Sequence, residues 1–161
     1  MKNRKVVGKA KLQGIVRALQ QKKKSVVFTN GCFDLIHAGH VRYLRKARSL
    51  GDALVVAVNT DASVRRLKGR GRPLVSLPHR LEVLSALEPV DYLVAFGQAT
   101  PQRLVRDIKP DILAKGADYK ESEIVGGALV KRRGGRVVRI PLVGGLSTSR
   151  LVSKIRRGNG A

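Results

Sequence analysis

The sequence predicts an α/β protein built on a five-stranded parallel sheet, doubly wound and Rossmann-like. Two observations predict this fold. Five short runs rich in β-branched residues alternate with longer stretches of helical periodicity, which is typical of parallel α/β sheets. The runs are apolar on both faces, so helices must cover both sides of the sheet, and right-handed crossovers place them in two layers. The expected strands are residues 25–29, 53–58, 92–96, 112–115 and 136–140.

The first regular element is an amphipathic helix over residues 9–21. Apolar residues recur there at helical spacing; they are Leu12, Ile15, Val16 and Leu19. Together with the lysines that follow, this helix makes residues 1–24 a basic N-terminal extension. Residues 25–161 then form the domain that carries the function.

The next helix is expected over residues 38–50, with Gly51 as its C-terminal stop. A short helix follows Asp61. The other helices are expected to begin at capping side chains, two of which stand beside an early proline. These expected caps are Ser76 with Pro78, Thr100 with Pro101, Ser122, and Ser147 or Thr148.

The charge of the chain points to anionic partners. Its 33 basic and 11 acidic residues give a formal charge of +22 at pH 7, and such a field attracts nucleotides, sugar phosphates, nucleic acid or acidic lipid. Three Tyr, three Phe and no Trp leave few aromatic rings for stacking on bases. We therefore expect no nucleic acid as partner, and a basic nucleic-acid-binding module stays as the alternative from a different functional class.

Composition also limits where the protein works. No apolar run approaches the roughly 20 residues of a spanning helix, and the first residues lack the apolar segment of a secretory signal. We expect a cytoplasmic protein without a membrane partner. The single cysteine, Cys32, allows neither a disulfide framework nor a Cys-rich zinc site.

Polar residues follow the carboxyl ends of four expected strands. These segments are residues 29–40, 59–61, 115–119 and 144–149. In a doubly wound sheet, ligands bind outside the carboxyl ends of the strands, where the strand order reverses. The sequence therefore predicts one ligand site at this edge.

A histidine pair stands at the start of the helix after the first strand. His37 and His40 are three residues apart and so share a helix face. They lie at the end of the helix where backbone N–H groups and the macrodipole favour an anion, and Gly39 leaves the backbone open to a ligand. This pattern predicts a polyphosphate site. A metal pair is the other chemical option, but no third His or Cys cluster stands nearby, so we expect no dedicated metal site.

The segment Thr29-Asn30-Gly31-x-Phe33-Asp34-x-x-His37-x-Gly39-His40 resembles the signature of the small nucleotidyltransferases with a His-x-Gly-His motif, which include cytidylyltransferases and adenylyltransferases. The resemblance runs from about residue 25 to 157. Further counterparts are Leu67-Lys68-Gly69, Arg80, Lys115-Gly116-Ala117-Asp118-Tyr119 and Gly145-Leu146-Ser147-Thr148. It implies the Rossmann-like nucleotidyltransferase fold.

Within this group the chain most resembles the D-glycero-β-D-manno-heptose 1-phosphate adenylyltransferases, which make ADP-heptose for lipopolysaccharide cores. Cytidylyltransferases for glycerol phosphate usually carry Arg-Thr-x-Gly before the Ser-Thr pair, and here Leu142-Val143-Gly144-Gly145 stands in its place. The alternatives are a cytidylyltransferase for glycerol phosphate or phosphoethanolamine, and an FMN adenylyltransferase.

The resemblance implies that a sugar-phosphate oxygen attacks the α-phosphorus of ATP and that pyrophosphate leaves in line. It implies catalytic roles for His37, His40 and Lys68, with Lys68 and Arg80 meeting the triphosphate. The residues implied to bind the nucleotide are Asn30, Gly31, Phe33, Gly39, Arg80, Gly116, Ser147 and Thr148. Asp34 would order the first loop or the acceptor, and Lys115 and Asp118 would contact heptose or nucleotide.

Two further expectations concern partners. Mg²⁺ should arrive with ATP, because no carboxylate cluster suggests a metal cage made by the protein. Heptose enzymes of this kind often occur fused to a sugar kinase, so a separate kinase is expected to supply the acceptor. We leave open whether the protein forms a homo-oligomer.

Overall fold

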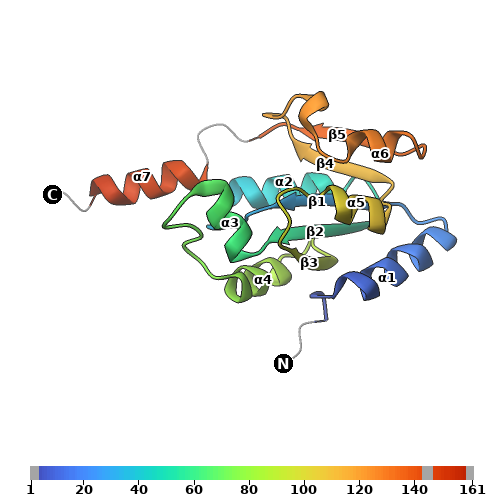
Figure 1. Ribbon diagram of the computed structural model, residues 1–161, viewed down its shortest axis with the longest axis horizontal. Coiled ribbons are helices and arrows are strands. Elements are labelled where there is room, and N and C mark those ends of the chain that lie inside the picture. Colours follow the sequence, from blue (N-terminus) through green and yellow to red (C-terminus); the bar gives the residue numbers. More distant parts are fainter. Residues whose placement is uncertain (1–3, 143–146, 159–161) are drawn as a thin grey trace.

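The computed structural model describes residues 4–142 and 147–158. Within them, five strands form one sheet in the order β3-β2-β1-β4-β5, and every neighbouring pair is parallel (Figure 1). The strands are β1 (Val26–Gly31), β2 (Ala53–Asn59), β3 (Tyr92–Phe96), β4 (Ile112–Gly116) and β5 (Arg136–Ile140). The predicted five-stranded parallel sheet is confirmed, and its strand order reverses between β1 and β4.

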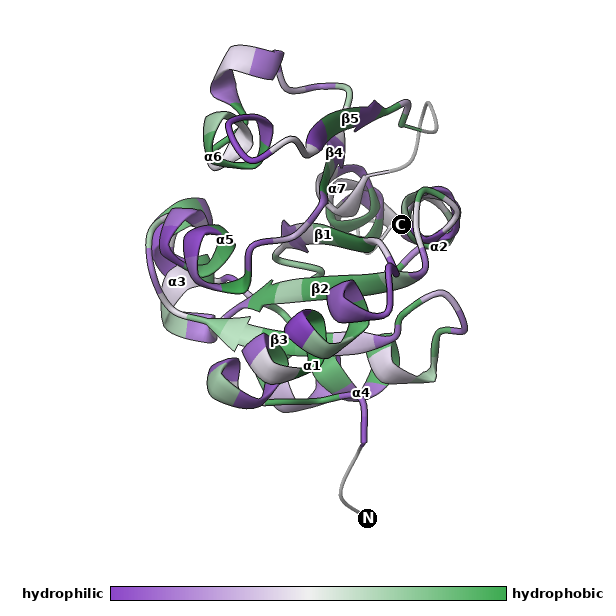
Figure 2. Ribbon diagram, turned by 90° about the vertical axis from the view of Figure 1, so that its right-hand side faces the viewer, coloured by the Kyte–Doolittle hydropathy of each residue, from purple (hydrophilic) through white to green (hydrophobic). Residues whose placement is uncertain are grey.

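Helices cover both faces of this sheet. They are α1 (Lys9–Gln21), α2 (Ala38–Arg48), α3 (Asp61–Lys68), α4 (Leu77–Ala86), α5 (Gln102–Ile108), α6 (Gly127–Lys131) and α7 (Thr148–Gly158), with a 3₁₀ turn at Glu121–Glu123. Apolar residues of α1, α5 and α6 pack on one face, and those of α2 and α4 pack on the other. Figure 2 shows the hydrophobic colour concentrated in the central strands between these layers. The fold is therefore doubly wound, as predicted.

The N-terminal helix α1 packs directly onto the sheet. Its residues Leu12 and Val16 are fully buried in the core of that face, and an isolated parallel bridge joins Val6 to Leu93 in β3. In the described residues, the segment expected as a basic extension is thus one of the helices that cover the sheet.

Three of the expected helix caps differ from the structure. The N-cap of α5 is Pro101 in place of Thr100, and no side chain caps that helix. Ser76 does precede α4, but its hydroxyl contacts His79 Nδ1 at 3.2 Å instead of capping the backbone. Ser122 lies inside the 3₁₀ turn, and α6 begins after Gly126, whose φ of +91° is a conformation that glycine adopts without a steric penalty. A glycine turn therefore begins this helix, and the cap expected at Ser122 was wrong.

None of the helices in the described ranges has the length and apolar character needed to cross a bilayer. The helix α7 projects away from the sheet beyond the carboxyl ends of the strands (Figure 1). Its first residues lie at the edge where the sequence places the ligand site.

Candidate active site

The site is centred where β1 and β4 lie side by side. Their ladder pairs Val27 with Ile112 and Phe28 with Leu113 among the described residues, although both strands continue further. Beyond that point a side chain joins them, because Lys115 Nζ donates to Asn30 Oδ1 at 3.0 Å and to the Asn30 carbonyl at 3.2 Å. The structure thus brings together two residues that the sequence assigned to the site.

The Lys115 ammonium also lies over an aromatic ring, with Nζ 5.0 Å from the centroid of Tyr119. Burial lowers the pKa of Lys115, and the nearby Asp118 carboxylate partly opposes this effect. The Tyr119 side chain is exposed, so one face of this cation is packed and its surroundings remain open to a ligand. The lysine is a cation held in place at the point where the strand order reverses.

The histidine pair lies at the N-terminal end of α2, as the spacing predicts. His37 is the N-cap residue, and the helix begins at Ala38. The rings of His37 and His40 are stacked, with centroids 3.9 Å apart and planes inclined at 29°. The Phe33 ring packs against His40 at a centroid distance of 5.4 Å. Both imidazoles therefore face the same way at the start of the helix.

Burial favours the neutral form of both histidine rings. The pKa of His40 falls to about 4, first because burial disfavours the charged ring and second because His37 is close. Burial also lowers the pKa of His37. The Nδ1 atoms of both rings are buried and have no hydrogen-bond partner among the described residues. Buried polar atoms are normally paired, so these two nitrogens point to a ligand that supplies the partner.

Asp34 holds a neighbouring loop instead of facing the open site. Its buried carboxylate accepts hydrogen bonds from Arg72 Nη1 at 2.5 Å, Leu74 N at 2.7 Å and Val75 N at 3.0 Å. All three donors belong to residues 69–76, here called the strap, which runs from α3 to α4. Of the two roles expected for Asp34, this geometry favours ordering the first loop.

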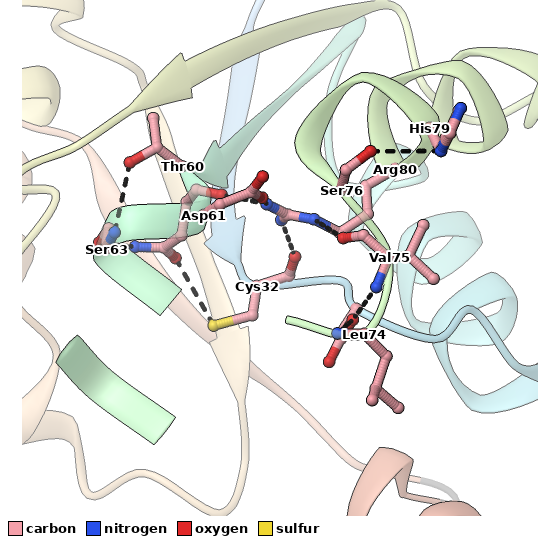
Figure 3. Close-up of polar contacts among 11 residues, drawn as sticks. Cys32, Thr60, Asp61, Ser63, Leu74, Val75, Ser76, His79 and Arg80 are labelled. Carbon is pink, nitrogen blue, oxygen red and sulfur yellow. Dashed lines mark hydrogen bonds and ion pairs between the residues drawn. The ribbon is translucent and has the colours of Figure 1, made fainter. Parts of the chain in front are cut away.

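Arg80, which the resemblance implies would meet the triphosphate, is enclosed by the loops of the site. Its side chain has no exposed surface. Figure 3 shows the guanidinium enclosed by Cys32, Asp61 and Val75. Nε donates to the Val75 carbonyl at 3.0 Å, Nη1 to the Cys32 carbonyl, and Nη2 to the Asn59 carbonyl at 2.7 Å and to Asp61 Oδ1 at 2.8 Å. This arginine lies beneath the site, with its donors already engaged by the protein.

Lys68 ends α3 with an exposed side chain. It lies close enough to the first loop that its charge opposes the effect of burial, which raises the pKa of the Cys32 thiol. Lys68 is therefore the exposed cation that flanks this loop from the α3 side.

Two glycines make room for site side chains. A Cβ on Gly31 would meet the Phe33 ring at 3.0 Å, and a Cβ on Gly116 would collide with the Asp118 carboxylate. Phe33 itself has a φ of +48°, an uncommon conformation for a residue with a side chain. These glycines shape the site by leaving space for Phe33 and Asp118.

The start of α7 is joined to the loop before α2. Thr148 Oγ1 donates to the Leu35 carbonyl at 3.4 Å, and Ser147 Oγ accepts from Arg150 N at 3.2 Å, as a capping side chain does. A second helix N-terminus thus lies near the histidines. Gly144, Gly145 and Leu146, which belong to the expected glycine-rich segment before it, lie outside the described residues.

Sequence reasoning missed the role of Arg72. The signal was present in the glycine-rich run Gly69-Arg70-Gly71-Arg72-Pro73, which is typical of a loop. The sequence does not say which carboxylate such a loop meets. Among the described residues, no group of three His, Cys, Asp or Glu side chains could hold a metal ion.

Comparison with curated proteins finds several relatives that carry the same name, bifunctional protein HldE. The bifunctional protein HldE of Citrifermentans bemidjiense is 57% identical over 132 residues, which are 82% of this chain and 27% of that protein. HldE of Geobacter metallireducens is 50% identical over 149 residues, 92% of this chain and 30% of that protein. HldE of Coxiella burnetii is 54% identical over 132 residues. The chain spans less than a third of the length of these relatives.

Solved structures agree on the fold. The lipopolysaccharide core biosynthesis protein from Thermoplasma volcanium has a TM-score of 0.61 and 31% identity, and the match covers 74% of this chain and 97% of that one. Pantoate-beta-alanine ligase from Francisella tularensis has a TM-score of 0.62 at 16% identity, with 94% and 78% covered. The second similarity bears on the fold alone.

A family model described as cytidylyltransferase-like matches residues 28–139. These residues include most of β1, the histidine pair, the strap and β4, and they end before α7. The chain therefore belongs to the cytidylyltransferase-like family.

Proposed function

We propose that this protein transfers AMP from ATP to D-glycero-β-D-manno-heptose 1-phosphate, forming ADP-heptose and releasing pyrophosphate. The observation that carries the proposal is the stacked pair of neutral imidazoles at the start of α2, whose buried Nδ1 atoms lack partners in the described residues. The choice of acceptor is supported by the identity with the HldE proteins and with the lipopolysaccharide core biosynthesis protein.

In this reaction an oxygen of the sugar phosphate attacks the α-phosphorus of ATP. The new P–O bond forms as the bond between the α-phosphorus and the bridging oxygen breaks, and that oxygen leaves with pyrophosphate. The attacking phosphate is already ionised, so no general base is needed. The protein has to align two anions and stabilise the charge that moves onto the leaving group.

The described residues can meet both tasks. His37 and His40 would donate ring N–H groups to phosphate oxygens at the end of α2 where the helix dipole also favours an anion. The hydroxyls of Ser147 and Thr148 would hold phosphate at the start of α7, and Lys68 would meet the triphosphate from α3. These groups come from three elements that converge on the loop after β1.

Lys115 lies on the other side of the site, held by Asn30. We assign it to the nucleotide or the sugar phosphate, together with Asp118. Gly31, Phe33, Gly39 and Gly116 would shape the surface against which the nucleotide lies.

Mg²⁺ would enter on the triphosphate and neutralise part of its charge. Two carboxylates near the site, Asp34 and Asp61, are engaged with arginines. Asp118 is then one carboxylate by itself, which supports a metal ion that arrives with the triphosphate. The acceptor must come from a phosphorylation reaction, which a sugar kinase would carry out.

The experiment that tests the proposal is a matrix of nucleotides and acceptors. The protein is incubated with Mg²⁺ and either ATP or CTP, together with heptose 1-phosphate, glycerol 3-phosphate, phosphoethanolamine or FMN, and released pyrophosphate is measured. We expect turnover with ATP and heptose 1-phosphate. Turnover confined to CTP or to FMN would overturn the choice of substrates.

A second experiment tests the alternative that the protein is a basic nucleic-acid-binding module. Binding of single-stranded RNA is measured over a range of salt concentrations in the wild-type protein and in a variant with both site histidines replaced by alanine. Tight, salt-sensitive binding in both proteins, without transfer of any nucleotide, would favour a basic nucleic-acid-binding module.

A further inference from the structure

We propose that Arg80 is a positioning residue for nucleotidyl transfer, which sets the geometry of the histidine pair without touching either substrate. The inference rests on the proposed function and adds to it a buried residue on α4. It follows from the bonds that join Arg80 to three separate loops at the carboxyl edge of the sheet (Figure 3).

A closed ring of contacts joins the loop after β1 to the strap. Arg80 donates to the carbonyls of Cys32 and Val75. The Val75 N–H donates to Asp34, two residues after Cys32. The main chain of Val75 is therefore held on both sides, because its N–H donates to the Asp34 carboxylate and its carbonyl accepts from the Arg80 guanidinium. Asp34 lies in the loop after β1, and Arg80 binds the same loop through the Cys32 carbonyl.

This loop leads into the histidine pair. Only Leu35 and Ile36 separate Asp34 from His37, the N-cap of α2. His37 then accepts the first backbone hydrogen bonds of the helix, from His40 N at 2.9 Å and Val41 N at 3.3 Å. Fixing Cys32 and Asp34 therefore fixes the direction from which the chain reaches His37.

The same guanidinium holds a third loop. Nη2 donates to the Asn59 carbonyl at the end of β2 and to Asp61 at the start of α3. The Asn59 amide in turn donates to Ser63 Oγ at 2.9 Å. The helix that ends at Lys68 is thus tied to the same buried cation as the loop that carries the histidines.

Only an arginine can make this set of bonds. Its planar fork points five N–H donors in fixed directions, and here they reach acceptors from Cys32, Asn59, Asp61 and Val75. A lysine has three donors on one nitrogen, so it would leave some of these acceptors unpaired. Since rates depend steeply on the alignment of reacting groups, a small displacement of the histidines lowers turnover more than binding.

The test compares Arg80→Lys with Arg48→Lys. Arg48 is a matched control because its guanidinium also pairs with one carboxylate, Asp91 at 2.7 Å, and one carbonyl, that of Gly51 at 2.6 Å, at the other end of α2. Pyrophosphate release gives kcat and KM for ATP, and thermal denaturation gives Tm. We expect both variants to lower Tm, but only Arg80→Lys to lower kcat, by about tenfold or more with KM for ATP changed by less than about threefold.

Two outcomes would overturn the assignment. A kcat for Arg80→Lys that matches Arg48→Lys would mean that Arg80 contributes stability alone. A large rise in KM for ATP with unchanged kcat would mean that Arg80 contacts the nucleotide directly. Restoration of turnover in Arg80→Ala by added guanidinium ion, at concentrations that leave the fold intact, would support positioning by the guanidinium group itself.

A second readout does not depend on activity. The chain has three histidines, so imidazole nitrogen resonances can be assigned to His37, His40 and His79. We expect the resonances of the stacked pair to move in Arg80→Lys and to stay in place in Arg48→Lys; unchanged resonances in both variants would overturn the proposal. If the wild-type protein transfers no nucleotide, the proposed function fails, and these resonances still decide the role of Arg80.

Discussion

His37 and His40 stack their imidazole rings 3.9 Å apart, and both rings are held in the neutral form. Two cationic rings at this distance would repel each other, whereas two neutral rings can pack and still offer ring nitrogens to a phosphate. Protonation of both rings would therefore oppose their stacking.

We predict that the stability of the protein falls as the pH drops from about 6.5 to 4. The folded state holds the pKa of His40 at about 4, whereas in the unfolded chain it returns to about 6.5. Between these values the unfolded state binds more protons, so acid favours unfolding. Thermal denaturation of the wild-type protein and His40→Gln from pH 7.5 to 4.5 measures the effect.

The His40→Gln variant should show a weaker loss of Tm over this range. Carboxylates whose pKa is lowered in the fold, such as Asp52 and Asp107, lose their contribution only at more acidic pH. Equal slopes of Tm against pH in both proteins would show that His40 is not the group that titrates.

Replacing either site histidine by alanine should lower kcat by about 100-fold or more, because each ring is assigned to hold charge that develops in the transition state. His79→Ala is the matched control, since this histidine is exposed on α4 and contacts Ser76. Pyrophosphate release measures all three variants. Near-normal turnover in His37→Ala and His40→Ala would end the assignment.

Asp34→Asn should destabilise the fold by about 2 kcal/mol, because a buried carboxylate that pairs with Arg72 would become an amide whose NH₂ group faces the guanidinium. Urea denaturation measures the change. Lys131→Gln is the comparison, because it breaks an exposed ion pair with Glu121, and such pairs contribute little. A similar shift of the urea midpoint in both variants would contradict the role of Asp34 as the support of the strap.

Lys115→Met should keep or raise Tm while it lowers kcat/KM by about tenfold. Burial already lowers the pKa of this ammonium, so its charge costs stability in the fold, and methionine keeps an unbranched apolar stem. Lys11→Met, at an exposed position on α1, should leave both quantities unchanged. A drop in Tm without a change in kcat/KM would mean that Lys115 only joins β1 to β4.

The sequence by itself determined the sheet, the covering helices and the position of the histidine pair. Strand and helix periodicities repeat within a few residues, so α1, β3 and β5 have the bounds that the pattern predicts. The three-residue spacing of His37 and His40 also sufficed to place both rings side by side at the start of α2.

Only the tertiary structure shows which groups Asp34 and Arg80 contact. Their charge and their place near the motif suggested contact with ligands, but both are engaged by the protein. The Cys32 carbonyl that Arg80 holds is 48 residues away, and the Val75 N–H that Asp34 accepts is 41 residues away. A buried charge pairs with the donors or acceptors that the packed loops place beside it. The folded core decides which loops lie together, so the spacing of residues along the sequence does not reveal these partners.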